Sequence, residues 1–194
     1  MIDNALNKNA QRSKKMIKKA FVELLQTEDF KKITVTKLAN KAEINRGTFY
    51  AHYLDTKQVI AEISNEIMEQ IGLIIKGIKN INLLDNPLPT LLKINKFLKK
   101  DLEYYKLLAS VKESSEFIEK LVEIFVNKIL SDSQLQNIIN DYEQFMVIVS
   151  FTANGLASFY IDYLRGKTTA DIDKTAVLIS KIIQNNFKTF IHTF

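Results

Sequence analysis

Residues 34–53 read TVTKLANKAEINRGTFYAHY, and this stretch decides how the chain folds. Its spacing of apolar residues predicts two short helices joined by a tight turn. Thr34 and Asn45 are good N-cap residues, so we expect the two helices to begin just after them. Phe49 and Tyr53 are four positions apart and share one face of the second helix. We expect Phe49 to point into a small core.

The outward side chains of the second helix are suited to a nucleic acid. The donors that can reach phosphates and base edges are Arg46, Thr48, Tyr50, His52 and Tyr53. Such a set, presented on a short helix after a turn, is typical of a helix that reads the major groove of DNA. An alternative for Arg46 is a surface salt bridge to Glu43 or Asp55, and Asn45 is a stronger candidate for a helix cap than for a base reader.

The distribution of charge supports the same interpretation. Residues 1–57 hold 12 Lys or Arg against 6 Asp or Glu, a net charge of +6, whereas the other 137 residues hold 15 and 16, a net charge of −1. Nearly all the excess positive charge therefore accompanies the helix-turn-helix stretch, as expected for a protein that binds a polyanion. The alternative is a solvated basic N-terminus in a lysine-rich protein.

The amino-acid composition limits the fold class and the kinds of chemical site that the chain can have. The chain has 194 residues, 46% of them hydrophobic, with 5 Gly, 2 Pro and no Cys. Few turn-forming residues favour long helices, and the lack of cysteine excludes thiolate metal sites, disulfides and a cysteine nucleophile. Residues 1–20 are polar and basic, unlike a signal peptide. Polar residues interrupt the most apolar stretch, 142–164, so we expect a cytoplasmic protein outside the membrane.

Helical periodicity extends over most of the chain and predicts an all-α fold of about nine helices without strands. The segments with this spacing are 10–27, 56–78, 91–108, 114–130, 140–164 and 171–191. Loop-forming residues at 80–89 interrupt the helices, and we expect the helix that precedes them, at 56–78, to belong to both parts of the chain. We expect a three-helix helix-turn-helix DNA-binding domain at 1–57 and a larger helical effector-binding and dimerisation domain at 58–194.

Residues 12–60 resemble the N-terminal domain of the TetR-type (tetracycline-repressor-like) transcriptional regulators. The match rests on the basic first helix, on ITVTKLA at 33–39, on INRGTFYAHY at 44–53 and on DTK at 55–57. The chain departs from the family at Glu43, where a turn glycine is common. A non-glycine residue with positive φ there costs about 1 kcal/mol.

The resemblance implies roles for individual residues. The helix after Asn45 would enter the major groove, with Arg46 as the best base reader and Lys57 on a phosphate at a helix N-terminus. Gly47 would allow the backbone to approach DNA closely. The residues that we expect to contact DNA are Thr36, Lys37, Asn45, Arg46, Gly47, Thr48, Tyr50, His52, Tyr53 and Lys57.

The resemblance also places effector binding and dimerisation in the larger part, with the last two helices forming a four-helix bundle with those of a second copy. Its many aromatic residues favour a small apolar or aromatic effector. The residues that we expect to line the pocket are Phe97, Tyr104, Phe117, Phe125, Phe145 and Phe151. We expect no cofactor, metal or catalytic site, because His52 and His192 are far apart in sequence and lack an acidic cluster.

Two functions remain open at this point. The first is a dimeric, effector-controlled regulator, most often a repressor in this family, that binds a palindromic operator in double-stranded DNA. The second is a helical adaptor or activator whose effector is a partner protein. This second possibility rests on residues 151–166, which resemble a TetR subgroup that includes the activator of dihydroxyacetone-kinase operons, whose effector is a protein subunit.

Overall fold

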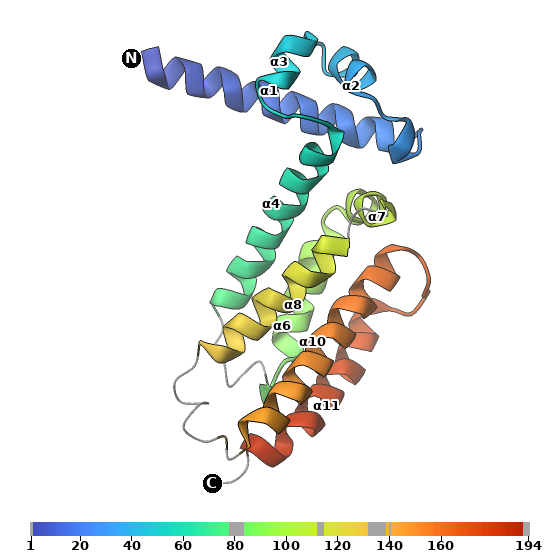
Figure 1. Ribbon diagram of the computed structural model, residues 1–194. Coiled ribbons are helices and arrows are strands. Elements are labelled where there is room, and N and C mark those ends of the chain that lie inside the picture. The colour runs from blue at the N-terminus through green and yellow to red at the C-terminus, as the bar shows by residue number, and fades with distance from the viewer. Residues whose placement is uncertain (1, 78–83, 112–114, 132–138, 140, 192–194) are drawn as a thin grey trace. The chain divides into compact units, whose positions relative to one another are not determined.

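The computed structural model describes residues 2–77, 84–111, 115–131, 139 and 141–191 (Figure 1). Within these ranges the chain forms nine α-helices and one short 3-10 helix, η1, and no strand, which confirms the predicted all-α fold. The elements are α1 (Ile2–Leu25), η1 (Phe30–Lys32), α2 (Val35–Lys41), α3 (Arg46–Tyr50), α4 (Thr56–Lys76), α6 (Leu88–Lys99), α7 (Leu102–Ser110), α8 (Ser115–Leu130), α10 (Tyr142–Leu164) and α11 (Ile172–Ile191). They divide into two compact units, Met1–Ile67 and Met68–Phe194.

The smaller unit is built on α1, against which α2 and α3 pack. Its core contains large side chains with no exposed surface, namely Ile17, Phe21, Leu38, Phe49 and Val59. The ring of Phe21 meets that of Phe30 edge to face, with 5.9 Å between centroids, in a geometry that aromatic pairs favour. Because α2 and α3 each have only one apolar side, this core fixes which side chains of the two helices face solvent.

Side-chain caps start α2 and α3 where the sequence predicts them. The Thr34 hydroxyl accepts a hydrogen bond from the backbone N–H of Lys37 at 3.3 Å. The Asn45 carbonyl oxygen accepts one from the N–H of Thr48 at 2.7 Å. Each cap satisfies a donor that the first helical turn leaves unpaired. Helices of seven and five residues would be marginal in isolation, so these caps and the shared core hold them together.

The turn between α2 and α3 passes through the left-handed region at Glu43, with φ at 56°. The N–H of Ile44 donates to the carbonyl of Ala39 at 3.0 Å, and the N–H of Glu43 donates to that of Asn40 at 3.1 Å. These bonds close the end of α2 as a glycine-type C-terminal turn would. The chain therefore keeps the turn geometry and accepts the strain of a side chain at that position.

We expect Glu43→Gly to stabilise the protein by roughly 0.5–1 kcal/mol, because glycine adopts positive φ without strain but adds freedom to the unfolded chain. Urea unfolding measures the change. Glu43→Ala is the matched control, since alanine also lacks the carboxylate but retains the strained φ. Equal effects of the two substitutions would show that the charge, and not the backbone, sets the result.

The smaller unit extends to Ile67 and so includes the first part of α4. The carboxylate of Asp55 accepts a hydrogen bond from the N–H of Gln58 at 2.9 Å and starts α4. The Gln58 side chain reaches back to the N–H of Leu54 at 2.8 Å. The first turns of α4 then contribute Val59 and Ile63 to the same core as α1, so they belong to the smaller unit.

In the larger unit, α10 packs against α8, α7 and α11, and α11 also packs against α6 (Figure 1). The core includes Leu91, Ile94, Val149, Ile161 and Phe187, all buried. Helix α10 ends at Leu164 and is followed by Gly166, whose φ of +69° and backbone bonds form a glycine C-terminal turn.

Helix α10 is the one described helix that is long and apolar enough to cross a membrane by length and composition. Its buried side chains include Phe145, Val149, Ala153 and Ile161, which pack within the larger unit. A single helix of this kind is weak evidence for a membrane span.

Candidate DNA-binding surface and effector cavity

Helix α3 presents a short polar surface. Its buried residue is Phe49, which anchors the helix in the core of the smaller unit. Arg46, Gly47 and Tyr50 are exposed on the other side, and Thr48 is half-buried. The core therefore directs the predicted base-reading residues toward solvent, where a DNA groove could be reached.

Arg46 lies beside Tyr50 one turn later on α3. Its guanidinium carbon is 5.8 Å from the centre of the tyrosine ring, and a guanidinium nitrogen is 3.5 Å from the phenol oxygen. This stacking, rather than a salt bridge to Glu43 or Asp55, is the contact that the structure gives Arg46. Stacking leaves the guanidinium fork accessible for a bidentate partner.

Asn45 and Gly47 shape the start of α3. The Asn45 oxygen accepts from both the N–H and, at 3.1 Å, the hydroxyl of Thr48. This is the predicted capping role. A Cβ at position 47 would lie only 3.1 Å from that oxygen, so glycine protects the cap as well as leaving the backbone accessible.

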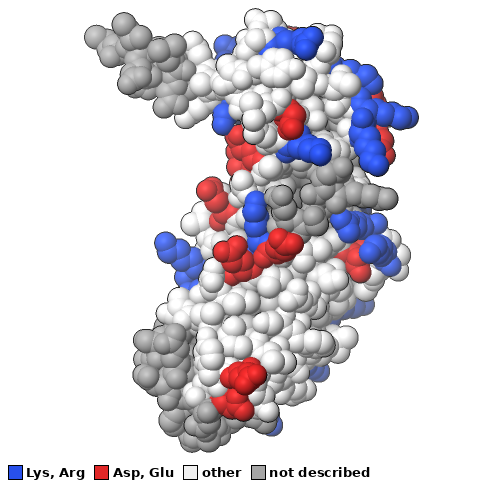
Figure 2. Space-filling view, viewed as in Figure 1, with Lys and Arg blue, Asp and Glu red and all other residues white. Residues whose placement is uncertain are grey.

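The remaining polar candidates flank α3. Thr36 and Lys37 are exposed in the first turn of α2, and Lys37 is paired with Glu28 at 2.5 Å. Lys57 is exposed in the first turn of α4. Lysine and arginine side chains recur over the visible surface of the smaller unit, with acidic side chains beside some of them (Figure 2).

His52 and Tyr53 differ in placement. His52 is half-buried, and its ring lies edge-on to that of Tyr53. Tyr53 is only 2% exposed, and its buried hydroxyl faces Glu62 without a hydrogen bond of acceptable geometry. Burial, followed by the neighbouring carboxylate, raises the pKa of Tyr53. The structure thus places Tyr53 in the core of the smaller unit and not on the surface that would face a phosphate.

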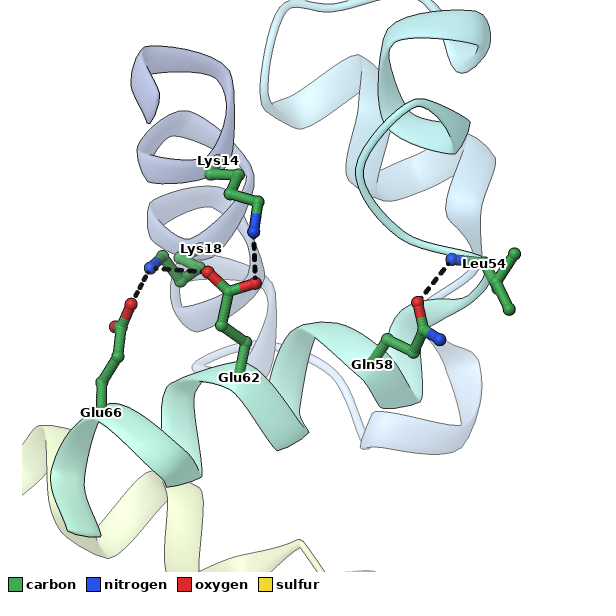
Figure 3. A network of polar contacts seen from close by, with 6 residues as sticks. All are labelled: Lys14, Lys18, Leu54, Gln58, Glu62 and Glu66. Atoms are coloured by element: carbon green, nitrogen blue, oxygen red, sulfur yellow. Dashed lines mark hydrogen bonds and ion pairs between the residues drawn. The ribbon is translucent and has the colours of Figure 1, made fainter. Parts of the chain in front are cut away.

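An ion-pair cluster joins α1 to α4 beside Tyr53 (Figure 3). Glu62 accepts from Lys14 at 2.9 Å and from Lys18 at 3.4 Å, and Lys18 also pairs with Glu66. Burial opposes ionisation of Glu62, but the pairs with Lys14 and then Lys18 outweigh it and hold its pKa below the ordinary value. Two lysines of the basic first helix thus bind α4 within the smaller unit.

The larger unit contains an apolar cavity of about 60 Å³. Helices α4, α6, α8, α10 and α11 contribute to its wall. The described residues that line it are Ile71, Ile75, Pro87, Thr90, Leu91, Ile94, Leu98, Leu121, Phe125, Ala153, Leu156, Ala157, Tyr160, Leu164 and Ile183. Thr90 and Tyr160 supply the polar side-chain groups of this set.

Comparisons with known proteins agree with this architecture. No protein-family model matches the chain. The TetR transcriptional regulator of Streptococcus agalactiae 2603V is similar over 93% of this chain and 98% of its own, with a TM-score of 0.67 and 17% identity. The chain has the TetR-type fold. The dihydroxyacetone kinase operon activator DhaS is similar over 92% of this chain and 97% of its own, with a TM-score of 0.64 and 17% identity.

Two further comparisons bear on the TetR-type fold. The TetR family repressor AlkX of Dietzia sp. strain DQ12-45-1b is similar over 93% of this chain and 98% of its own, with a TM-score of 0.54 and 20% identity. A segment of 56 residues is 32% identical to the uncharacterized HTH-type transcriptional regulator YxbF of Bacillus subtilis (strain 168). That segment spans 29% of this chain and only 15% of YxbF.

The six aromatic residues that we expected to line the pocket lie on several helices of the larger unit. Phe125 lines the cavity. Phe145 packs instead against Phe187 and Phe190, with centroids 5.7 and 5.6 Å apart, and Phe151 is 75% exposed on α10.

Two of the other three pack against a neighbouring tyrosine. Phe97 and Tyr104 each pack against Tyr105, with centroid distances of 5.2 and 5.3 Å. Phe117 lies on α8. The cavity wall is therefore mainly aliphatic, and the aromatic rings mostly pack against one another.

Sequence reasoning missed Asn95, which is completely buried on α6. Its amide nitrogen donates to the carbonyl of Ile172 and to the carboxylate of Asp173, both at 2.9 Å. Its amide oxygen accepts from the hydroxyl of Tyr160 at 2.8 Å. Lys99 pairs with the same Asp173 at 2.5 Å. Asn95 thus connects α6 with α10 and α11 at the cavity wall.

The charge states of this network follow from its contacts. The bonds from Lys99 and then Asn95 hold the pKa of Asp173 below its ordinary value, so it is ionised at neutral pH. Burial raises the pKa of Tyr160, so its phenol remains protonated. Within the described residues, no three His, Cys, Asp or Glu side chains gather as a metal site would require, and His192 lies outside that part of the chain.

Proposed function

We propose that the protein is a sequence-specific DNA-binding transcriptional regulator, and that it acts as a dimer released from its operator by an effector. The observation that carries this proposal is the exposed polar face of α3, held by the Asn45 cap and the buried Phe49. The basic smaller unit adds the sequence-independent attraction to phosphates. Such a regulator would act in the cytoplasm, and repression is the mode that we favour.

The outer faces of α10 and α11 support the dimer. Both helices expose large apolar side chains, whereas a monomeric soluble protein rarely presents a contiguous apolar patch. These side chains are Tyr142, Val147, Phe151, Val177, Leu178 and Ile182. Much of the visible face of the larger unit is also uncharged (Figure 2). We call these six residues the apolar face, and propose that it packs against its symmetry mate in a second copy.

A twofold dimer determines the form of the operator. Two copies of α3 related by a twofold axis would read two half-sites of opposite orientation, about 34 Å or one DNA turn apart. The operator would therefore be palindromic. In some dimer geometries the two α3 helices would be wrongly spaced for DNA. An effector that binds such a geometry more tightly would shift the population toward it and so release the operator.

A second candidate function is an activator controlled by a partner protein. It is favoured by the shared fold with DhaS, whose name describes an operon activator. A protein that copurifies with the chain and changes its affinity for DNA would support this alternative. Saturable binding of a small molecule in the cavity would favour the first function.

The DNA contacts can be tested with two substitutions that act differently. We expect Arg46→Ala to cost roughly 1–3 kcal/mol and to relax selectivity at one base pair, because it removes a bidentate base contact. We expect Lys57→Ala to weaken all sequences alike and to lower the slope of log K against log salt by about 1, because it removes one phosphate contact. Titrations of the DNA upstream of the gene and of a scrambled duplex, at several salt concentrations, measure both effects.

Lys174→Ala is the control for these titrations. Lys174 is exposed on α11, in the larger unit, and its loss changes the net charge by the same amount. We expect it to leave DNA affinity nearly unchanged. If the unmodified protein bound the two duplexes equally, or without salt dependence, the proposed function would be wrong.

A further inference from the structure

The cavity wall selects against charge. None of its described lining residues is ionisable near neutral pH, and thirteen of the fifteen are apolar. An ion placed there would lose its hydration without gaining a counter-charge, which is strongly unfavourable. An apolar wall of this kind instead gains from covering aliphatic surface. The occupant that fits is uncharged.

The size of the cavity is a second restriction. An apolar cavity of about 150 Å³ accommodates benzene, whereas this one has about 60 Å³. Without displacement of the wall, the space therefore admits a molecule with fewer heavy atoms than a six-membered ring. The expected effector, a small apolar or aromatic molecule, is therefore restricted to a small aliphatic one.

The Asn95 network fixes the direction of the hydrogen bond at the wall. The Ile172 carbonyl and the ionised Asp173 carboxylate only accept, so the Asn95 amide nitrogen must face them and its oxygen must face Tyr160. Tyr160 has a single hydroxyl proton and donates it to Asn95. Toward any further partner the phenol oxygen can only accept.

We propose that the cavity binds a small, uncharged aliphatic alcohol whose hydroxyl donates to the phenol oxygen of Tyr160. The proposal rests on the proposed function, because it identifies the chemical class of the effector. A ketone or an ester brings only acceptors and would meet an acceptor at Tyr160. A carboxylate adds a charge that the wall does not compensate. Thr90 is the other residue of the wall whose side chain carries a hydroxyl.

Three probes of one shape test this selectivity: 2-propanol, acetone and acetate. They share a skeleton of four heavy atoms and differ in donor capacity and charge. Methyl NMR of isoleucine-labelled protein, without DNA, would follow binding through Ile71, Ile75, Ile94 and Ile183, which line the cavity. We expect saturable shifts with 2-propanol, about fivefold weaker binding of acetone for one lost hydrogen bond, and no saturable shift with acetate.

Variants assign the effect to the cavity and to Tyr160. In Tyr160→Phe we expect the preference for 2-propanol over acetone to disappear. Thr90→Val, which removes the other hydroxyl, should retain it. Ala157→Val adds two methyl groups to the wall and should abolish the shifts of both probes, whereas Ala170→Val, at an exposed position, should not. Spectra recorded without probes show whether each variant is folded.

The outcomes that would overturn the proposal are equally distinct. They are equal binding of acetone and 2-propanol, saturable binding of acetate, loss of the preference in Thr90→Val but not in Tyr160→Phe, or no saturable shift with any probe. Operator binding by the unmodified protein is measured separately. If DNA binding holds and the probes fail, only the effector class is wrong. If the probes behave as expected and DNA binding fails, the proposed function is wrong instead.

Discussion

Phe151→Asp is expected to convert the protein to a monomer and to lower operator affinity about a hundredfold or more, because two linked reading helices bind far more tightly than one. Phe151 is 75% exposed, the largest exposed fraction in the apolar face, and Val147 lies one turn earlier on α10. A carboxylate there would be buried without a partner in each half of a twofold interface. Sedimentation and operator titration measure the two effects.

Leu73→Asp is the matched control for this substitution. Leu73 is 63% exposed and lies on α4, outside the apolar face. The same change of chemistry there should leave the protein dimeric. A Phe151→Asp protein that remained a dimer with full operator affinity would show that α10 does not form the interface.

Asn95→Ala is expected to destabilise the larger unit by roughly 3 kcal/mol. The substitution removes three hydrogen bonds, two of them buried, and leaves the buried hydroxyl of Tyr160 without its acceptor. The loss should exceed the gain of about 0.6 kcal/mol in helix propensity that alanine brings. Urea unfolding, followed through the tyrosines of the larger unit, measures the change.

Lys96→Ala provides the comparison on the same helix. Lys96 is the next residue on α6 and is exposed. We expect its substitution to change stability by less than about 0.5 kcal/mol. Equal effects at positions 95 and 96 would mean that the Asn95 hydrogen bonds contribute little beyond those made with water in the unfolded chain.

The smaller unit could be predicted from sequence because its signals are local. The caps at Thr34 and Asn45 and the turn at Glu43 are formed by residues within a few positions of one another. The spacing of Phe49 within its helix likewise marks the side that faces inward. Tyr53 was harder to place. Its spacing from Phe49 shows a shared face, but its burial depends on tertiary packing that brings Lys14 of α1, far from it in sequence, over its ring.

The larger unit was less predictable, for two physical reasons. Helix α10 has apolar residues around most of its circumference, so periodicity cannot distinguish the buried Phe145 from the exposed Phe151. Asn95 lies among lysines in the sequence and resembles a residue of a solvated face. Only the approach of Tyr160 and Asp173, 65 and 78 positions away, makes it a buried connector.

The construction of α3 separates fold maintenance from recognition. The Asn45 cap and the buried Phe49 hold the helix in the fold, and the exposed Tyr50 ring lies edge-on to Phe49 with 5.7 Å between centroids. Arg46 is exposed and contacts Tyr50. Duplicated copies of such a gene could therefore change Arg46 and acquire new target sequences at little cost in stability. For the same reason, this five-residue helix is a suitable place to redesign the DNA sequence that the protein recognises.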